Sequence, residues 1–252
     1  MRKTRAVNVA NLQGWGKEDL DPTRPGSRQI SHKQEPATEV PEGPTFSAAF
    51  DEQFQALLRW RRDVRRFETT SIDAYVVDRL LDAACLAPSV GYSQPWRFVS
   101  IDSETAREAV RANFAKCNAE ALATYEGEKA QKYAELKLEG LREAPVQFAV
   151  FTDVATSVGH RLGRRTMPET LVYSTVMAIQ NLWLSARVLG IGVGWVSILD
   201  PQELCSSLDV DPRWVFTAYL CLGYPKAVSA QPELRRVGWE QRNDEARRVL
   251  HR

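Results

Sequence analysis

Residues 169–198 read ETLVYSTVMAIQNLWLSARVLGIGVGWVSI, and this stretch decides the fold class. Residues 169–189 are apolar nearly all round at helical spacing, which is typical of a central buried helix. The glycine-rich remainder predicts a tight turn followed by a short strand. A buried helix that leads straight into a strand indicates a domain in which helices pack on a sheet.

Three polar side chains interrupt this apolar helix on one face. Ser174, Asn181 and Ser185 are spaced by seven and four residues, so a helix places them on the same side. A buried hydroxyl that finds no hydrogen-bond partner costs about 1–3 kcal/mol. Ser174 could donate back to the carbonyl one turn earlier, as helical serines commonly do, or it could face a ligand.

The segments around this helix alternate between helical and strand patterns. An apolar stripe with a candidate N-cap at Ser71 and a stop at Pro88 predicts another helix. Runs of aromatic and β-branched residues predict further strands at 96–101, 145–153 and 214–225. Because the spacing is not that of regular βαβ units and no GxGxxG turn occurs, we expect an α+β fold with a central mixed or antiparallel sheet wrapped by helices.

The character of the chain changes near residue 45. Residues 1–45 carry five of the 13 prolines and show no periodicity, which predicts a flexible or wrapping N-terminal extension. The pattern of residues 46–252 is that of a folded domain. Within it, residues 103–142 are highly charged and predict two exposed helices, broken near Gly127, that could form a lid.

Charge and cysteine usage exclude several classes of protein. Lys and Arg number 33 against 32 Asp and Glu, so no global field recruits nucleic acid or an anionic membrane. The four cysteines form no CxxC pair and the three histidines are isolated, which argues against a zinc site or a disulfide framework. No stretch reaches the roughly 20 apolar residues of a membrane helix. We expect a cytoplasmic protein without metal, nucleic-acid or membrane partners.

The run RRDVRRF begins at Arg61 and places Asp63 among four arginines. A continuing helix would present Arg61 with Arg65 on one ridge and Arg62 with Arg66 on another, whereas a helix end would splay them around a turn. The run could be a solvated charge cluster, a nucleic-acid patch or a phosphate clamp built from guanidinium forks. The absence of interleaved aromatic and basic residues around it disfavours the nucleic-acid patch.

Two further segments combine small and polar residues. The loop APSVGYSQPWRFV, residues 87–99, runs from a helix stop into a strand and offers Ser89 and Gln94 to a flat polar ligand. The segment GVGWVS, residues 192–197, allows a ligand to approach the backbone closely. Each is also compatible with an ordinary turn, and neither has the spacing of a dinucleotide-binding signature.

Taken in order, RRDVRRF, APSVGYSQPWRFV, YSTVMAIQNLWLSARVLGIGVGWVSILDP and LCLGYP resemble the nitroreductase-like FMN enzymes, over roughly residues 50–242. The RRD form of the first motif, YSTV and KYAELKLEG are most similar to the flavin destructases of that family. The resemblance implies an α+β homodimer that binds FMN at the subunit interface under a lid at about residues 103–142. It also implies that reduced FMN is a substrate, which dioxygen fragments into 5,6-dimethylbenzimidazole, the lower ligand of cobalamin, and erythrose 4-phosphate.

The same resemblance implies the site residues. Asp63 and Ser174 match the acidic residue and the serine that are associated with flavin breakdown. We expect the arginines to keep Asp63 ionised as a general base, and Ser174 to donate a hydrogen bond to an intermediate. The chain departs from the family pattern at Arg66, where an acidic residue is familiar. The expected FMN-binding residues are Arg61, Arg62, Arg65, Ser89, Gln94, Gly192, Val193, Gly194, Trp195 and Arg242.

Two other functions stay open at this point. An FMN-dependent NAD(P)H nitroreductase or flavin reductase would keep its flavin, and a flavin-binding module would show no turnover. The pair of Asp63 and Ser174 favours flavin destruction, because simple hydride transfer needs neither residue. A separate flavin reductase is the expected source of reduced FMN, since the sequence shows no recognisable nicotinamide site.

Overall fold

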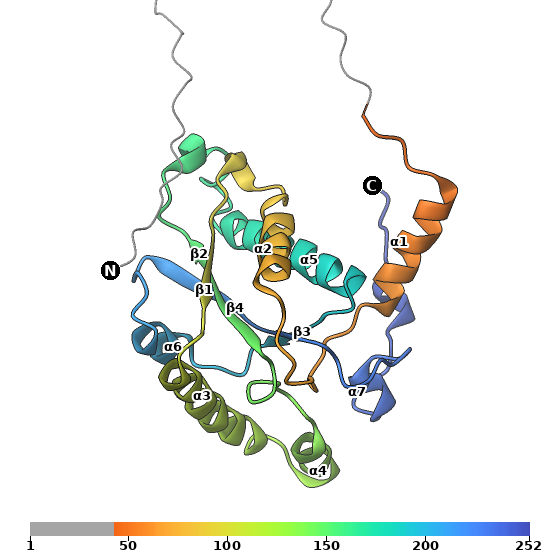
Figure 1. The fold of residues 1–252 in the computed structure, drawn as a ribbon, viewed down its shortest axis with the longest axis vertical. Coiled ribbons are helices and arrows are strands. Elements are labelled where there is room, and N and C mark those ends of the chain that lie inside the picture. Colours follow the sequence, from red (N-terminus) through yellow and green to blue (C-terminus); the bar gives the residue numbers. More distant parts are fainter. Residues whose placement is uncertain (1–42) are drawn as a thin grey trace, which may run out of the picture. The chain divides into compact units, whose positions relative to one another are not determined.

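A four-stranded sheet lies at the centre of the computed structural model, which describes residues 43–252 (Figure 1). The strand order is β1-β2-β4-β3, and each neighbouring pair is antiparallel. The α+β prediction is confirmed, and of the two sheet types considered the antiparallel one is present. The strands are β1 (Trp96–Ser100), β2 (Val146–Asp153), β3 (Gly192–Val196) and β4 (Trp214–Gly223).

Helices cover both faces of this sheet, because successive side chains of a strand point to opposite faces. Phe148 and Val150 of β2 belong to the core beneath α2 and α5, whereas Ala149 and Phe151 belong to the core on the side of α3 and α6. The central strands β2 and β4 are therefore apolar on both faces. The helices are α1 (Ala48–Trp60), α2 (Ala74–Cys85), α3 (Glu104–Leu122), α4 (Gly127–Glu135), α5 (Thr170–Val188), α6 (Pro201–Ser207) and α7 (Glu233–Arg236).

The start of α2 differs from the prediction. Asp73, not Ser71, is the N-cap, and its carboxylate accepts a hydrogen bond of 2.7 Å from the backbone N–H of Tyr75. The preceding backbone is not helical, and Ile72 is buried in the core. Burial of Ile72 thus keeps residue 71 outside the helix. The helix ends at Cys85, before the predicted stop at Pro88.

Helix α5 is apolar nearly all round, as predicted, but only one side of it is buried in this chain. Ala178, Ile179 and Leu182 belong to the core between this helix and the sheet. On the opposite side Tyr173 and Met177 are exposed, and Val176 is exposed beside them. Helix α1 adds the exposed apolar residues Phe50, Phe54 and Leu58, and Phe46, just before it, stacks on Phe50. We call these exposed residues of α1 and α5 the α1–α5 apolar surface.

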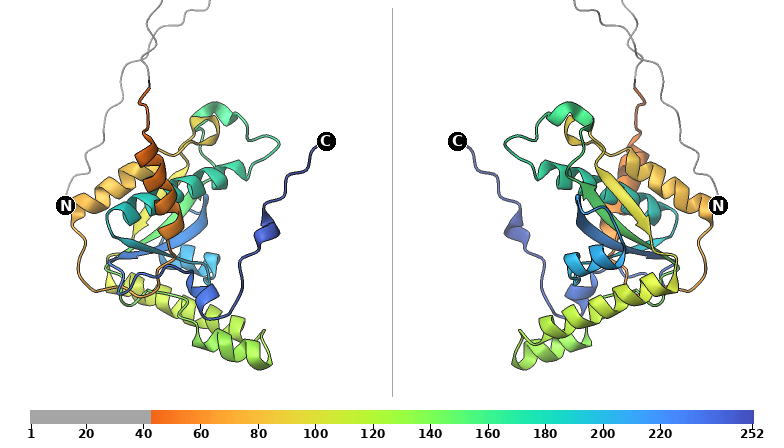
Figure 2. Two further views of the ribbon diagram at one scale, coloured as in Figure 1. Left: turned by 90° about the vertical axis from the view of Figure 1, so that its right-hand side faces the viewer. Right: turned by 90° about the vertical axis from the view of Figure 1, so that its left-hand side faces the viewer.

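The charged region around residues 103–142 forms the two predicted helices, α3 and α4 (Figure 2). The second is shorter than its sequence pattern suggests, because Leu136 adopts an extended backbone and ends it. The chain then passes Gly140, where an added Cβ would lie 2.4 Å from the ring of Phe67. This close contact requires glycine and places the segment after α4 against the RRDVRRF run.

The RRDVRRF run is extended rather than helical, because α1 ends at Trp60 and Arg61 already has an extended backbone. The run docks on β3: Asp63 forms a parallel bridge with Val193, and the Val64 N–H donates to the Val193 carbonyl at 3.0 Å. The glycines of β3 allow this approach. An added Cβ on Gly194 would lie 2.2 Å from the Val64 carbonyl oxygen.

We expect Gly194→Ala to lower the free energy of unfolding by about 2 kcal/mol, because the run would be forced off β3. Gly43→Ala is the matched control, since no atom lies within 4 Å of its added carbon. Urea denaturation followed by circular dichroism measures both variants. Equal unfolding free energies for the two would contradict the close docking of the run on β3.

Candidate active site

The extended run sorts its charged side chains onto two sides, since side chains alternate along an extended chain. Asp63 and Arg65 form an ion pair with each other on one side. Arg62 and Arg66 instead contact the segment that follows β4. The observed alternation replaces the two helical ridges considered from the sequence, and it separates the side chains bound to the segment after β4 from the pair of Asp63 and Arg65.

Asp63 is held by two hydrogen bonds. Its Oδ1 accepts from the backbone N–H of Trp195 at 2.9 Å, and Oδ2 accepts from Nη2 of Arg65. Partial burial nevertheless raises the pKa of Asp63 above its ordinary value, and Arg65 and the Trp195 N–H offset only part of this rise. The arginines act in the expected direction, since Arg65 and Arg61 lower the pKa of Asp63, but desolvation outweighs them and the net shift of the pKa is upward.

Arg61 and Arg65 offer donors on the same side as Asp63. The Arg65 side chain is 17% exposed, and its buried Nη1 has no hydrogen-bond partner in the described part of the chain. The Arg61 guanidinium lies 4.8 Å from the ring centroid of Trp183. A buried guanidinium with an unused donor favours an anionic or carbonyl ligand.

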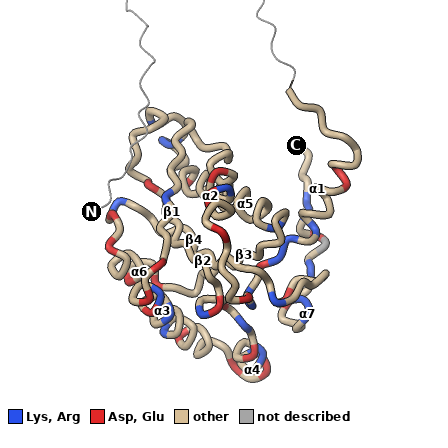
Figure 3. Tube along the Cα trace, viewed as in Figure 1, with Lys and Arg blue, Asp and Glu red and all other residues tan. Residues whose placement is uncertain are grey.

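Arg62 has a different environment. Its Nε donates to the Ser229 carbonyl at 3.1 Å and its Nη2 donates to the Ala230 carbonyl. Burial lowers the pKa of Arg62, and the nearby charges of Arg61 and Arg187 lower it further. Contact between Arg62 and a phosphate would require the guanidinium to leave these carbonyls. Figure 3 shows several basic residues gathered between α1 and α7.

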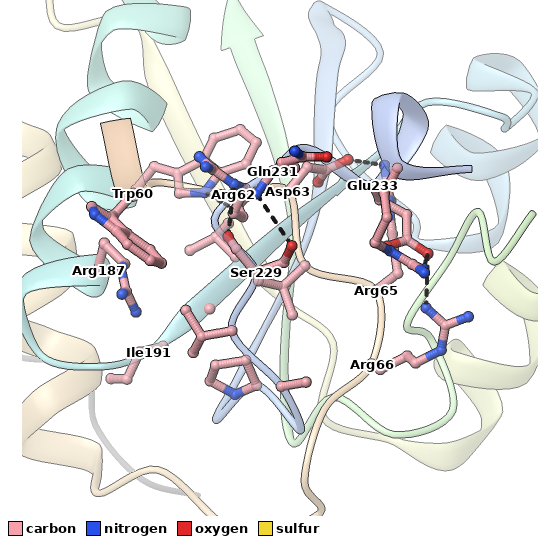
Figure 4. A pocket seen from close by; sticks show the side chains of 18 residues that line it. Trp60, Arg62, Asp63, Arg65, Arg66, Arg187, Ile191, Ser229, Gln231 and Glu233 are labelled. Atoms are coloured by element: carbon pink, nitrogen blue, oxygen red, sulfur yellow. Dashed lines mark hydrogen bonds and ion pairs between the residues drawn. The ribbon is translucent and has the colours of Figure 1, made fainter. Parts of the chain in front are cut away.

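A cavity of about 320 Å³ opens beside the run (Figure 4). Five of the predicted site residues line it: Arg62, Asp63, Arg65, Gly192 and Val193. The other predicted residues lie outside it: Arg61, Ser89, Gln94, Ser174, Gly194, Trp195 and Arg242. Arg242 belongs to the C-terminal segment after α7.

The cavity also has lining residues that the sequence did not reveal, among them Trp60, Trp183 and Arg187. Trp183 and Arg187 are four residues apart on α5, so helical spacing could have paired them. Glu233 also lines the cavity and binds Arg66 at 3.3 Å. No local pattern indicates that contact, because 167 residues separate the partners.

Ser174 joins α5 to the loop of residues 87–99. Its hydroxyl donates to the Thr170 carbonyl at 2.7 Å and accepts from the Val90 N–H at 3.0 Å. The back-bond to the preceding helical turn is thus confirmed, and the hydroxyl also holds the loop of residues 87–99. Since its only hydrogen is already donated, Ser174 must leave Thr170 before it can donate to a ligand.

The loop itself has a strained backbone. Tyr92 has a φ of 56° and Gln94 a φ of 45°, which non-glycine residues rarely adopt. The Ser89 hydroxyl accepts from the Gln94 N–H at 3.0 Å and stabilises this conformation. Strained backbone that is held by specific hydrogen bonds is commonly associated with binding and catalytic loops.

One chain does not bring Asp63 and Ser174 together. The indole N–H of Trp183 donates to the Arg62 carbonyl at 3.1 Å, which places the run beside that turn of α5. Ser174 lies nine residues earlier on the helix, or about 13 Å along its axis. The run that carries Asp63 therefore lies beside the C-terminal half of α5, whereas Ser174 lies in its N-terminal half.

Residues 58–224 match the family model described as the nitroreductase family. The chain belongs to the nitroreductase family. A relative from Rhodospirillum rubrum, named 5,6-dimethylbenzimidazole synthase, is 55% identical over 79% of this chain and 95% of its own length. Another of the same name, from Rhodobacter capsulatus, is 46% identical over 78% of this chain and 95% of its own length.

Solved structures agree on the fold. Iodotyrosine deiodinase, in a crystal structure with FMN and 3-iodo-L-tyrosine, gives a TM-score of 0.61 at 21% identity and covers 79% of this chain and 97% of its own. The nitroreductase-like fold expected from the sequence is thus confirmed. Among residues 43–252, no cluster of His, Cys, Asp or Glu is placed to hold a metal ion, and no helix is long and apolar enough to span a membrane.

Proposed function

We propose that this protein is a 5,6-dimethylbenzimidazole synthase, which fragments reduced FMN with dioxygen into 5,6-dimethylbenzimidazole and erythrose 4-phosphate. The names of the relatives at 55% and 46% identity support this reaction. The structural observation that carries it is the Asp63 carboxyl, held on β3 by the Trp195 N–H with its pKa raised by burial. An acid–base group beside a flavin-sized cavity is required for fragmentation, whereas simple hydride transfer needs none.

In this proposal the flavin supplies the electrons that activate dioxygen, and the protein residues bind, orient and move protons. Asp63 accepts a proton from the ribityl side of the flavin. Arg61 and Arg65 hold the phosphate and the flavin edge, joined by Arg62 only if it leaves the carbonyls of Ser229 and Ala230. The remaining proposed contacts come from Ser89, Gln94, Gly192, Val193, Gly194, Trp195 and Arg242.

We further propose that the enzyme is a homodimer whose site is completed by the partner. Several large apolar side chains are exposed together on the α1–α5 apolar surface, whereas a typical monomer exposes such side chains singly. This clustering supports burial against a second copy. The separation of Asp63 from Ser174 within one chain supports the same arrangement, because a two-fold axis can bring the two ends of α5 from different chains together.

Incubation of the purified protein with chemically reduced FMN in air tests the proposed reaction. We expect 5,6-dimethylbenzimidazole and erythrose 4-phosphate in equal amounts by mass spectrometry. Intact flavin with oxidation of NAD(P)H would instead identify a reductase, and intact flavin without turnover a binding protein. NAD(P)H with oxidised FMN should give product only after a separate flavin reductase is added.

The raised pKa of Asp63 predicts the pH dependence of product formation. A general base acts only when deprotonated, so the rate should rise with pH and fall away as the pH drops through the raised pKa, above the value of about 3.9 for an ordinary aspartate. Because Arg65 lowers the pKa of Asp63, Arg65→Gln should move this acidic limb to higher pH. Single-turnover rates measured at about one-unit intervals from pH 4 to 8 locate this acidic limb. A limb that moved to lower pH would contradict the assignment of Asp63.

A further inference from the structure

Three aromatic rings meet where the C-terminal part of the chain crosses α3 and α4. The Trp239 ring lies 5.6 Å from that of Tyr125 and 6.0 Å from that of Tyr133, measured between centroids. The Lys129 ammonium lies 4.0 Å from the Trp239 centroid. Tyr133 donates to Asn118 of α3 at 2.9 Å. A single side chain, Trp239, thus contacts both the connection between α3 and α4, through Tyr125, and the body of α4, through Tyr133.

The chain that carries Trp239 is fixed at its other end to the RRDVRRF run. We call residues 225–239 the C-terminal strap. Its backbone binds Arg62 through the carbonyl of Ser229 and Arg66 through the N–H of Lys226, at 3.1 Å each. Glu233 adds the ion pair with Arg66. The strap therefore connects the structural side of the run to the aromatic cluster.

Helix α4 depends on this connection. It has nine residues, its N-cap Glu126 makes no side-chain capping bond, and Tyr133 is its only buried residue. Isolated helices of this length are unstable in water, so tertiary contacts must hold α4 in place. Trp239 packs on the one buried residue that α4 has.

The position of α4 matters for the flavin-facing residues because the chain after α4 packs on the run. Gly140 contacts the ring of Phe67, and its added Cβ would lie 3.3 Å from the Arg65 carbonyl oxygen. A displacement of α4 would draw this segment away from Arg65. The partly buried environment of Arg65 and Asp63 would then open to water.

We infer that Trp239 is a positioning residue, which acts through α4 to keep water away from the flavin while it is being fragmented. This inference rests on the proposed function. Water access favours the competing reaction, in which dioxygen takes two electrons and two protons from reduced FMN to give oxidised FMN and hydrogen peroxide. Trp239 should therefore control the ratio of benzimidazole to peroxide rather than the affinity for FMN.

The test compares Trp239→Ala with Trp239→Phe in the full-length protein. Ala should lower the ratio of 5,6-dimethylbenzimidazole to hydrogen peroxide by about ten-fold while the Kd for FMN changes by less than about three-fold, and Phe should restore most of the ratio because it keeps a packed ring. Lys116→Gln is the control, since Lys116 lies on α3 but pairs with Glu203 of α6. An unchanged ratio in Trp239→Ala would overturn the inference.

Hydrogen exchange supplies a readout that does not need the proposed reaction. Amide exchange of residues 127–135 should accelerate by at least about ten-fold in Trp239→Ala, with no change in the strands of the sheet. Lys129→Gln, which removes only the ammonium over the Trp239 ring, serves if the Ala variant fails to fold and should accelerate the same amides. Wild-type protein that makes no benzimidazole would refute the proposed function alone, whereas unaltered exchange in both variants would refute the role of Trp239.

Discussion

Asp63→Asn should lower the rate of 5,6-dimethylbenzimidazole formation by about 1000-fold, within the range that a general base contributes. Asn keeps a carbonyl oxygen that can accept from the Trp195 N–H, so the run should stay on β3. It cannot take a proton, and the amide nitrogen that replaces Oδ2 cannot accept from Arg65. The Kd for FMN should change by less than about five-fold, because the contact that is lost is a partly exposed ion pair with Arg65 within the protein, worth about 0–1 kcal/mol.

Asp211→Asn is a matched control for this change. Asp211 and Arg213 form an ion pair two residues apart, as Asp63 and Arg65 do. The two carboxyls differ in environment: Arg213 and its N–H hold the pKa of Asp211 at about 2, whereas burial raises that of Asp63. Single-turnover product formation and anaerobic FMN titration should show no change for Asp211→Asn. A tenfold or smaller loss for Asp63→Asn would contradict a proton-transfer role, since a mere ion-pair loss accounts for that much.

The fold was largely predictable because its signals are local. The all-round apolar pattern at 169–189 gave α5, and β-branched runs gave β2 and β4 within two residues at each end. Two short helices, α6 and α7, escaped notice because four to seven residues contain too few turns to show a periodicity. The exposed side of α5 was also not predicted, since an apolar sequence pattern does not distinguish burial within one chain from burial by a partner.

The site was less predictable, because its arrangement depends on contacts between distant parts of the chain. Helical spacing grouped Arg61 with Arg65, but only the pairing of Asp63 with Val193 on β3 shows that the run is extended. The raised pKa of Asp63 likewise follows from desolvation in the folded chain, which the neighbouring residues in the sequence do not determine. Residue types predicted the chemistry of the site, and long-range docking decided which side chains are available for it.

Ser174→Ala should lower product formation by about 100-fold and the free energy of unfolding by about 1–3 kcal/mol, because the Val90 N–H would lose its acceptor in a part-buried position. The strained residues Tyr92 and Gln94 lie two and four residues after Val90, so the loop should lose its fixed geometry. Ser206→Ala is the matched control, since the Ser206 hydroxyl also donates four residues back, to Gln202 at 3.0 Å, but holds no loop. The unfolding free energy of that variant in urea and its single-turnover rate should both equal the wild-type values within experimental error.

Mixing the two inactive variants tests whether Ser174 acts on the Asp63 of its own chain or on that of a partner. If each site takes Asp63 from one chain and Ser174 from the other, an Asp63→Asn chain paired with a Ser174→Ala chain contains one intact site. Random exchange at equal concentrations makes half of the dimers mixed, so activity should recover to about a quarter of the wild-type value. No recovery after exchange, verified by mass measurement of the mixed dimers, would place both residues in the site of a single chain. Recovery would explain why Asp63 and Ser174 lie beside different halves of α5, since these two halves would then serve different flavins.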